Sequence, residues 1–338
     1  MPKRRLASLA ILAASALAVW PAQTLADCKL LRAAEFHVDL SRGVPVIEGQ
    51  VNGESAQILI DSGADTSMVV RSEAIRRGLD MRRVIGVQIH VVGGSSEVLE
   101  TNIKSLKIDN FSTSNLPLLV TGPRDGMEGV AIILGDDFLS QYDVEFDLAN
   151  STIRLFEPQG CSAEQLVYWG KNYAQATLLP WQRDSPVTQA NVILNGKPVL
   201  GEIDSGATGS VVDAATAAAV GVNRPPTSAR TMIGGFGPRR REAWTATFDS
   251  FAFGDEKIAN ARLAVADLVT DFETDSDSAT SIVPARLYRT ASMLIGADFL
   301  KAHRVYVGNK EHVIVFSYNG GAIFRTAEAA SAPASAPQ

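Results

Sequence analysis

The chain contains an internal repeat, and this repeat limits the possible folds more than any other feature. Residues 51–69 align without gaps with residues 194–212 at an offset of 143, and nine of these 19 positions are identical. The identities include an Asn-Gly pair, the run Ile-Asp-Ser-Gly-Ala, a later serine and the final valine. A fixed period of this kind is typical of duplicated structural units. We therefore expect two halves with the same fold.

A second block of the repeat lies further along each half. Residues 133–139 match residues 294–300 at an offset of 161, so the difference from the first offset of 143 places an insertion of 18 residues in the second copy. The acidic and hydroxyl-rich stretch 271–281 has the composition of a turn, and we expect the insertion there as an exposed loop. The same offset of 161 pairs two segments, around Asn150 and Asn309, that both have the pattern of paired strands.

Within each copy the pattern is mostly that of β-structure. Short β-branched runs alternate with turn residues, and Asn52-Gly53 and Asn195-Gly196 are strong hairpin signals. We expect two further hairpins centred on Gly93-Gly94 and Gly234-Gly235. Helix is expected only in short stretches, such as 72–77 and 214–220. The sequence thus predicts an all-β fold of two pseudo-symmetric lobes with a few short helices.

The N-terminal residues 1–26 have the pattern of a secretory signal peptide. Lys3, Arg4 and Arg5 precede an apolar run over 6–20, and small residues lead to a cleavage point before Asp27. A retained membrane anchor is the alternative, although the apolar run is short for a membrane span. We expect a mature chain that starts at Asp27, has no stable membrane anchor and resides in a periplasm.

The remaining chain divides along the repeat. We expect lobe 1 over 27–160, an inter-lobe linker over 161–180 and lobe 2 over 181–325. The Ala/Ser/Pro-rich tail over 326–338 has too little apolar content to pack and is expected to be disordered.

The two cysteines, Cys28 and Cys161, lie at the start of the expected mature chain and just after its first half. In an oxidising compartment this arrangement suits a disulfide that closes lobe 1. Two free thiols are the alternative. A lipid anchor on Cys28 is disfavoured, because Asp27 occupies a position where such signals need a small residue.

Charge and residue content exclude several classes of function. Removing residues 1–26 takes away three basic and no acidic residues, which changes the net charge from −6 to −9 and argues against a nucleic-acid partner. The sequence has no His-Glu-x-x-His motif and no Gly-x-Ser-x-Gly elbow. The four histidines are scattered along the chain. We therefore expect no metal and no cofactor.

Asp61 and Asp204 are the residues best placed for chemistry. Each follows an apolar strand and begins a tight Ser-Gly turn at the same position of the repeat. If the lobes pack face to face, the two carboxylates meet near a pseudo-twofold axis and share one proton, because both cannot ionise cheaply. The charged member can then act as general base on a water molecule while the protonated member polarises a carbonyl. The alternative is that both aspartates are ordinary turn residues without a catalytic role.

The run Ile-Asp-Ser-Gly-Ala at 60–64 and 203–207, followed by apolar-apolar-Gly at 133–135 and 294–296, resembles the retropepsin and pepsin superfamily of aspartic peptidases. The resemblance covers nearly all of the expected mature chain. It implies an aspartic endopeptidase with Asp61 and Asp204 as catalytic dyad, using the shared proton known for aspartic proteases. A peptide or protein is then the substrate, and a single chain completes the site as a monomer.

The resemblance also implies roles for neighbouring residues. Ser62 and Ser205 would brace the two active-site loops, and the backbone of Gly63 and Gly206 would approach the carboxylates. The hairpins at Gly93-Gly94 and Gly234-Gly235 resemble flaps that bind substrate. This pattern departs from pepsin, since no tyrosine is placed as in the pepsin flap and Arg239–Arg241 form a basic run in the second hairpin.

Ala64 and Ala207 follow the retroviral pattern, whereas pepsin has hydroxyl residues there that can donate to a catalytic carboxylate. Without that hydrogen bond the apparent pKa of the dyad should be higher. We therefore expect an activity optimum less acidic than that of pepsin. A non-catalytic peptide-binding envelope protein on the same fold is the alternative function.

Overall fold

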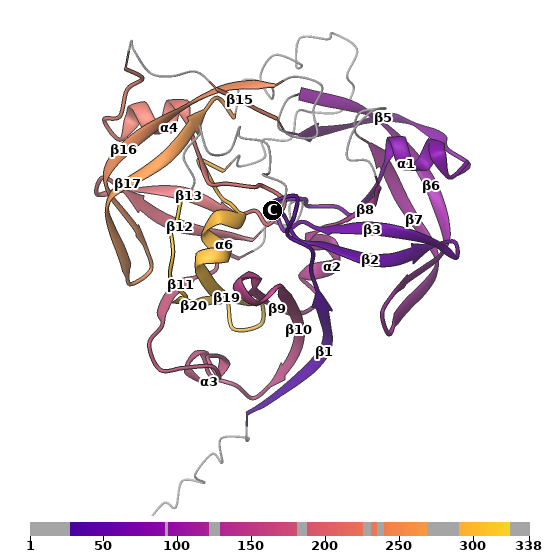
Figure 1. Cartoon of the computed structure of the whole chain (residues 1–338), viewed down its shortest axis with the longest axis horizontal. Coiled ribbons are helices and arrows are strands. Elements are labelled where there is room, and N and C mark those ends of the chain that lie inside the picture. The colour runs from indigo at the N-terminus through magenta and orange to yellow at the C-terminus, as the bar shows by residue number, and fades with distance from the viewer. Residues whose placement is uncertain are drawn as a thin grey trace, which may run out of the picture.

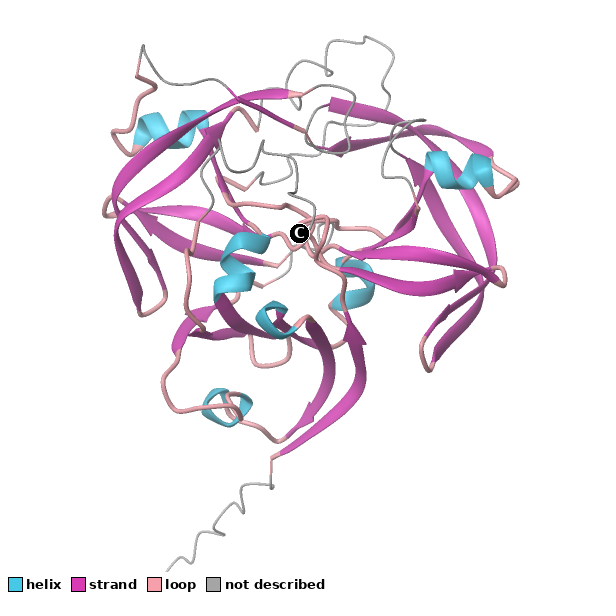
Figure 2. Cartoon of the chain, viewed as in Figure 1, coloured by secondary structure: helices cyan, strands magenta, loops and turns pink. Residues whose placement is uncertain are grey.

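The computed structural model describes residues 28–91, 94–121, 129–180, 188–225, 231–234, 240–268 and 291–324. The expected signal peptide, the acidic insertion over 271–281 and the tail over 326–338 lie outside these residues. Within the described ranges, none of the helices is both long and apolar enough to cross a membrane. The fold is mostly β with a few short helices, in two lobes that lie on either side of the molecule (Figures 1 and 2).

Lobe 1 is a β-barrel. Its strands are β2 (Val46–Val51), β3 (Glu54–Ile60), β4 (Met68–Val70), β5 (Arg82–Val91), β6 (Gly94–Ile108), β7 (Phe111–Thr121) and β8 (Val130–Leu134). They pair in the order β2-β3-β8-β4-β7-β6-β5, and an additional pairing of β2 with β6 closes six of them into a ring. Strand β5 extends this ring along β6. The five residues of β8 are all buried, since parallel and antiparallel neighbours cover them on both sides.

Lobe 2 repeats this barrel. Its strands are β12 (Gln189–Leu194), β13 (Lys197–Ile203), β14 (Val211–Asp213), β15 (Thr231–Ile233), β16 (Arg241–Phe253), β17 (Glu256–Ala266) and β18 (Met293–Ile295). Their order is β12-β13-β18-β14-β17-β16-β15, with β12 also paired to β16. Each position in this order corresponds to one in lobe 1, so the predicted pseudo-symmetric two-lobe β-fold is confirmed.

The Asn-Gly pairs make the turns that begin each barrel. Asn52 and Gly53 both have positive φ, 54° and 84°, and Asn195 and Gly196 have 48° and 78°. Two successive positive φ angles are the requirement of the type I′ turn, which asparagine and glycine satisfy most readily. The turns fix the register of the two hairpins β2–β3 and β12–β13.

A third sheet joins the lobes and contains strands from both halves of the sequence. It is formed by β1 (Lys29–His37), β9 (Asp143–Asp147), β10 (Thr152–Gln159), β11 (Ala174–Thr177), β19 (His303–Gly308) and β20 (Val313–Tyr318). The order β1-β10-β9-β19-β20-β11 places the strands of the first half beside those of the second, with the seam between β9 and β19. We call it the shared sheet. It lies beneath the two barrels in the view of Figure 1.

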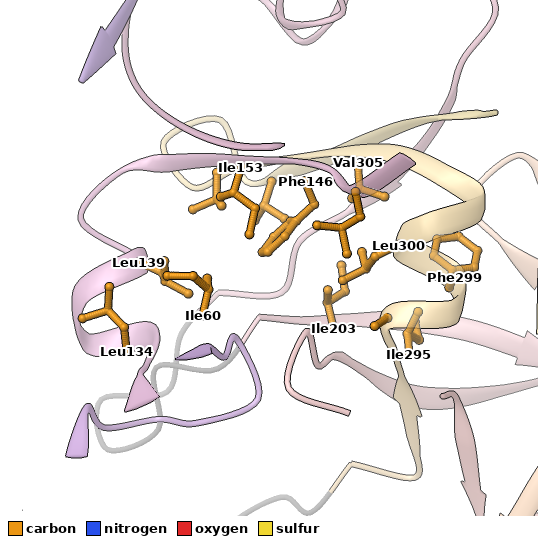
Figure 3. Packing of buried hydrophobic residues seen from close by; sticks show 14 of the residues in the cluster. Ile60, Leu134, Leu139, Phe146, Ile153, Ile203, Ile295, Phe299, Leu300 and Val305 are labelled. Atoms are coloured by element: carbon orange, nitrogen blue, oxygen red, sulfur yellow. The ribbon is translucent and has the colours of Figure 1, made fainter. Parts of the chain in front are cut away.

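The shared sheet supplies the middle of the main hydrophobic core. Phe146 and Val305, on its two central strands, point toward Ile60 and Ile203, the residues that immediately precede the two aspartates (Figure 3). All four side chains are buried. The turns that carry Asp61 and Asp204 therefore rest on a packed apolar layer, which holds them in place.

The segment 161–180, expected to be a linker, contains regular structure. Helix α3 (Ala163–Leu166) begins with a capping box formed by Ser162 and Gln165, and β11 pairs with β20 at the edge of the shared sheet. Cys28 and Cys161 form the expected disulfide at the outer edge of this sheet. The disulfide therefore connects the start of β1 to the end of β10, the strand with which β1 pairs.

The short helices occur where the sequence predicts them. Helix α1 (Arg71–Arg76) follows β4, and α4 (Ala214–Ala219) follows β14. Helices α2 (Asp136–Leu139) and α6 (Ala297–Ala302) begin directly after Gly135 and Gly296 of the second repeat block. Both of these last helices pack between a barrel and the shared sheet.

Candidate active site

Asp61 and Asp204 lie together where the two lobes meet. Each follows the end of a central barrel strand, β3 or β13, and its backbone N–H donates to the strand across the sheet, to Leu134 O at 3.0 Å and to Ile295 O at 2.9 Å. The two carboxyl groups lie close enough for the charge of Asp204 to raise the pKa of Asp61. The structure therefore brings the two sequence-predicted carboxylates into one site.

Glycine is required next to each aspartate by the close approach of the other lobe. A methyl group added at Gly63 would lie 2.4 Å from Cγ of Asp204, and one added at Gly206 would lie 2.3 Å from Cγ of Asp61. Both distances are shorter than carbon atoms tolerate. The two glycines thus leave the space in which each carboxyl group reaches across the interface.

The serines after each aspartate connect the two loops. Ser62 Oγ donates to Ile203 O at 2.7 Å, and Ser205 Oγ donates to Ile60 O at 2.8 Å. Each hydroxyl also accepts a hydrogen bond from the backbone N–H of the other serine, at 3.0 and 3.1 Å. Both side chains are buried. This reciprocal set of four hydrogen bonds holds the loops at a fixed separation.

The backbone of each loop donates to its own carboxylate. Gly63 N lies 3.0 Å from Asp61 Oδ1, and Ala207 N lies 2.8 Å from Asp204 Oδ1. The carbonyl oxygens of Ala64 and Ala207 accept hydrogen bonds from the first residues of α2 and α6. Each active-site loop is therefore closed on one side by the helix of the second repeat block.

Burial and mutual repulsion determine the protonation of the pair. Burial raises the pKa of Asp61 well above its usual range, and the charge of Asp204 raises it further. Burial also raises the pKa of Asp204, while hydrogen bonds from Ala207 N–H, from the Asp61 carboxyl and from Gly206 N–H lower it. Because the pKa values of both carboxyl groups are raised and their charges repel, the pair favours a state that holds one shared proton.

The serine and aspartate that recur downstream in both copies form a second matched pair of contacts. Ser67 Oγ donates to Asp137 and accepts from Gly135 N–H at 3.0 Å; Ser210 Oγ donates to Asp298 at 2.7 Å and accepts from Gly296 N–H at 3.0 Å. These contacts tie the chain after each active-site turn to the following helix. Sequence reasoning recorded the identities but gave them no role.

Two further carboxyl groups, which sequence reasoning missed, lie near the dyad: Asp136 is buried and Glu202 is half-buried. Asp136 accepts a hydrogen bond from Thr188 Oγ1 at 3.0 Å across the lobe interface, and burial raises its pKa well above the usual range. Glu202 accepts one from Gln189 Nε2 at 3.2 Å, and burial raises its pKa to about 8, with the charge of Asp204 adding to the effect. Neither residue has an acidic counterpart in the other copy, since Ala297 and Leu59 occupy the equivalent positions.

The residues expected in the flaps are described in part. Gly94 begins β6, which pairs with β5 through Val91, so a hairpin is present there, while Gly93 at its turn lies outside the described residues. Gly234 follows β15, which pairs with β16 as far as Arg241, and Gly235 lies outside the described residues. Among the residues that the structure describes, no group of three or more His, Cys, Asp or Glu residues could hold a metal ion.

Comparisons with known proteins agree with this geometry. Residues 47–141 match a family model described as "gag-polyprotein putative aspartyl protease", and residues 190–299 match one described as "Aspartyl protease". Each match contains one of the two aspartates and all or nearly all of the second repeat block of its copy. The two matches support the aspartic peptidase superfamily for both halves of the chain.

Other comparisons are more distant. The solved aspartic proteinase from Irpex lacteus is 12% identical to this chain, with a TM-score of 0.47, and the alignment covers 88% of this chain and 99% of that one. No curated protein matches the sequence significantly.

Proposed function

We propose that this protein is an aspartic endopeptidase in which Asp61 and Asp204 hydrolyse peptide bonds through a water molecule. The observation that carries the proposal is the approach of two carboxyl groups, one from each copy of the repeat, each held by its own loop and each close to the glycine of the other loop. A pair of this kind supplies a base and an acid at the same place. The superfamily support from the two family models points to the same chemistry.

The residues divide the reaction between them. Asp204, charged, accepts a proton from water, and the resulting hydroxyl adds to the carbonyl carbon of the scissile peptide bond. Asp61, protonated, donates to the carbonyl oxygen as its negative charge develops. The proton taken up by Asp204 then passes to the leaving nitrogen as the carbon–nitrogen bond breaks. One hydroxyl of the tetrahedral intermediate returns its proton to Asp61 as the carbonyl group re-forms. No covalent bond to the enzyme forms in this sequence of steps.

Substitution of either aspartate tests the proposal. We expect Asp61→Asn and Asp204→Asn each to lower kcat for a mixed peptide library by about 10²–10⁴-fold, the usual contribution of a positioned acid or base. Asp213→Asn is the matched control, because Asp213 is also a buried aspartate of lobe 2 but its carboxylate accepts hydrogen bonds from Ala215, Thr216 and Leu268. Circular dichroism verifies that all three variants fold.

Two outcomes would overturn the proposal. Equal turnover by wild type and Asp204→Asn would mean that the cleavage comes from another source. Binding of peptides without any turnover by wild type, and without inhibition by a statine-containing peptide, would instead establish the alternative, a peptide-binding envelope protein. The assays cover about pH 3–7, the range in which a shared carboxyl proton titrates.

We also propose a less acidic optimum than that of pepsin. Ala64 and Ala207 have no hydroxyl to donate to the carboxylates, and burial raises the pKa of both members of the pair. The profile of kcat/KM against pH should therefore peak well above pH 2, and a maximum near pH 2 would contradict this.

Export and assembly complete the proposal. A signal peptide over 1–26 would deliver the chain to an oxidising periplasm, where the Cys28–Cys161 disulfide is stable. Both aspartates come from one chain, so a monomer has a complete site. N-terminal sequencing of the exported protein should read from Asp27, and size-exclusion chromatography should give the mass of one chain.

A further inference from the structure

The two copies differ at one strand pair beside the dyad. In lobe 1, Val46 of β2 lies opposite Leu59 of β3. At the same register in lobe 2, offset by 143 residues, Gln189 of β12 lies opposite Glu202 of β13. An apolar cross-strand pair in one copy is therefore a hydrogen-bonded polar pair in the other.

The apolar pair of lobe 1 belongs to a hydrophobic cluster separate from the main core. Val46 and Leu59 pack there with Val44, Met68, Val70, Val130 and Ile133, and Ala64 of the active-site loop packs against them. Leu59 is 1% exposed. In lobe 2 the corresponding cluster contains neither Gln189 nor Glu202, and Glu202 is partly exposed.

The direction of the side chain on β13 places Glu202 on the side of the dyad. Successive side chains of a strand point to opposite faces. Ile203 points into the main core above the shared sheet (Figure 3), so Glu202 and Asp204 share the opposite face. The negative charges of Asp204, Asp61 and Asp65 add to the effect of burial in raising the pKa of Glu202, which agrees with this placement.

Leu59 has the same relation to Asp61 that Glu202 has to Asp204. The scissile bond must lie across the dyad for both carboxyl groups to act on it, so the substrate residues on its two sides meet these two faces. One face is apolar and the other carries a carboxyl group. We propose that Glu202 selects a basic side chain on one side of the scissile bond, and that the other side lacks this selection because Leu59 stands there in place of a carboxyl group. This inference rests on the proposed peptidase function.

Protonation links this selection to pH. Burial and the charge of Asp204 raise the pKa of Glu202 to about 8, so the empty site is mostly neutral at pH 7. A lysine or arginine beside Glu202 favours the ionised carboxylate, and binding then releases a proton. An apolar side chain at the same place releases none. Preference for the basic side chain should therefore increase as the pH rises toward 8.

The test compares pairs of peptides that differ at one residue, arginine or norleucine, placed immediately before or immediately after the scissile bond. Wild type should prefer arginine by about tenfold or more in kcat/KM at one of these positions and not at the other. Glu202→Leu, which installs the residue of lobe 1, should lose this preference and cut the norleucine peptide at least as well. Glu202→Gln keeps the shape and should also lose the preference.

A binding experiment gives a second measurement that does not depend on turnover. Statine-containing peptides with arginine or norleucine are titrated calorimetrically at pH 7 in two buffers of different ionisation enthalpy. Wild type should release close to one more proton with the arginine peptide than with the norleucine peptide. Glu202→Gln should show no difference between the peptides. Gln189→Val serves as a control for disturbance of the strand pair and should retain proton release.

The outcomes separate the two proposals. Cleavage that depends on Asp61 and Asp204 but shows the same arginine-to-norleucine ratio in wild type and both Glu202 variants would overturn the inference and leave the peptidase function standing. Absence of Asp-dependent cleavage would overturn the function and the inference together.

Discussion

The two lobes share their strand order but not the residues on the face beside the dyad. In lobe 1 this face carries a buried hydrophobic cluster that includes Val46 and Leu59. In lobe 2 the equivalent positions are occupied by Gln189 and Glu202. Everything that the dyad needs for its geometry is duplicated, including the glycines, the serines and the paired Ser-Asp contacts behind each loop. The comparison indicates that the two copies keep the same residues in the loops that meet at the pseudo-twofold axis. They differ in the strand side chains beside these loops.

The helix that follows the active-site loop is held differently in the two lobes. In lobe 2, Asp213 is the N-cap of α4, accepts from the N–H groups of Ala215 and Thr216, and also accepts from Leu268 N–H. In lobe 1 the N-cap of α1 is Val70, whose side chain cannot accept. There Glu73 is buried inside the first turn and binds Arg76 and Arg77. The same helix is therefore fixed by a cap in one copy and by an ion-pair network in the other.

The largest expected effect of the difference between lobes is on stability as the pH rises. The pKa of Glu202 is raised from 4.5 to about 8. A raised carboxyl pKa means that the folded state holds the proton more tightly, so the contribution of Glu202 is fully present below pH 4.5 and is lost as the pH rises to about 8. Burying the charged form costs several kcal/mol in general. Wild type should thus lose stability over this range.

Glu202→Gln should lose less stability over the same range, because its amide does not ionise. The free energy of unfolding is measured by urea titration at several values between pH 4.5 and 8. Asp136 and the dyad contribute in the same direction in both proteins, so the difference between the two curves isolates Glu202. Parallel curves would show that Glu202 is ionised at no cost and that the lobes do not differ in this respect.

A smaller effect is expected from the serines, and here the lobes should behave alike. Ser62→Ala and Ser205→Ala each leave buried backbone groups without a hydrogen-bond partner, which should cost about 1–3 kcal/mol. Because the two hydroxyls also hydrogen-bond to each other at 3.4 Å, the double variant should cost less than the sum. Urea denaturation measures these values, with the exposed Ser114→Ala as control. A clear difference between the two single variants in lost unfolding free energy would mean that the two loops are not equivalent.

The smallest effect concerns the helix caps. Asp213→Ala removes the hydrogen bonds to the first turn of α4 and should cost about 1 kcal/mol, while Asp213→Asn retains most of the cap. Thermal unfolding of the two variants gives the comparison. Equal melting temperatures for Asp213→Ala and wild type would show that α4 does not depend on its cap, and that the lobes hold this helix in the same way after all.

The sequence predicts the parts of the fold that local signals specify. The Asn-Gly turns, the two short helices after β4 and β14, and the equivalent positions of Asp61 and Asp204 follow from the repeat itself. The shared sheet does not, because the pairing of β1 with β10 and of β9 with β19 joins segments whose partners leave no local pattern. Strand β11 pairs with β20, which is distant in the sequence, so the segment 161–180 was predicted to be a linker.

The missed residues of the site have a related explanation. Identities between the two copies point to Ser62, Gly63 and their counterparts, whereas Glu202 and Asp136 matter because they differ from Leu59 and Ala297. Their burial depends on how the lobes meet, and the contact of Asp136 with Thr188 crosses that interface. Comparing the two repeat blocks of each copy for unmatched charges would have identified both residues.

The order of strands in the shared sheet has a consequence for biosynthesis. During translation the first half emerges with its own barrel and with β1, β10 and β9, and domains generally begin to fold before synthesis is complete. The partner strands β19 and β20 are the last regular elements to leave the ribosome. Both aspartates are therefore synthesised before the shared sheet, on which their loops rest, is complete. Under the proposed function, the site would therefore gain activity only after β19 and β20 have been made.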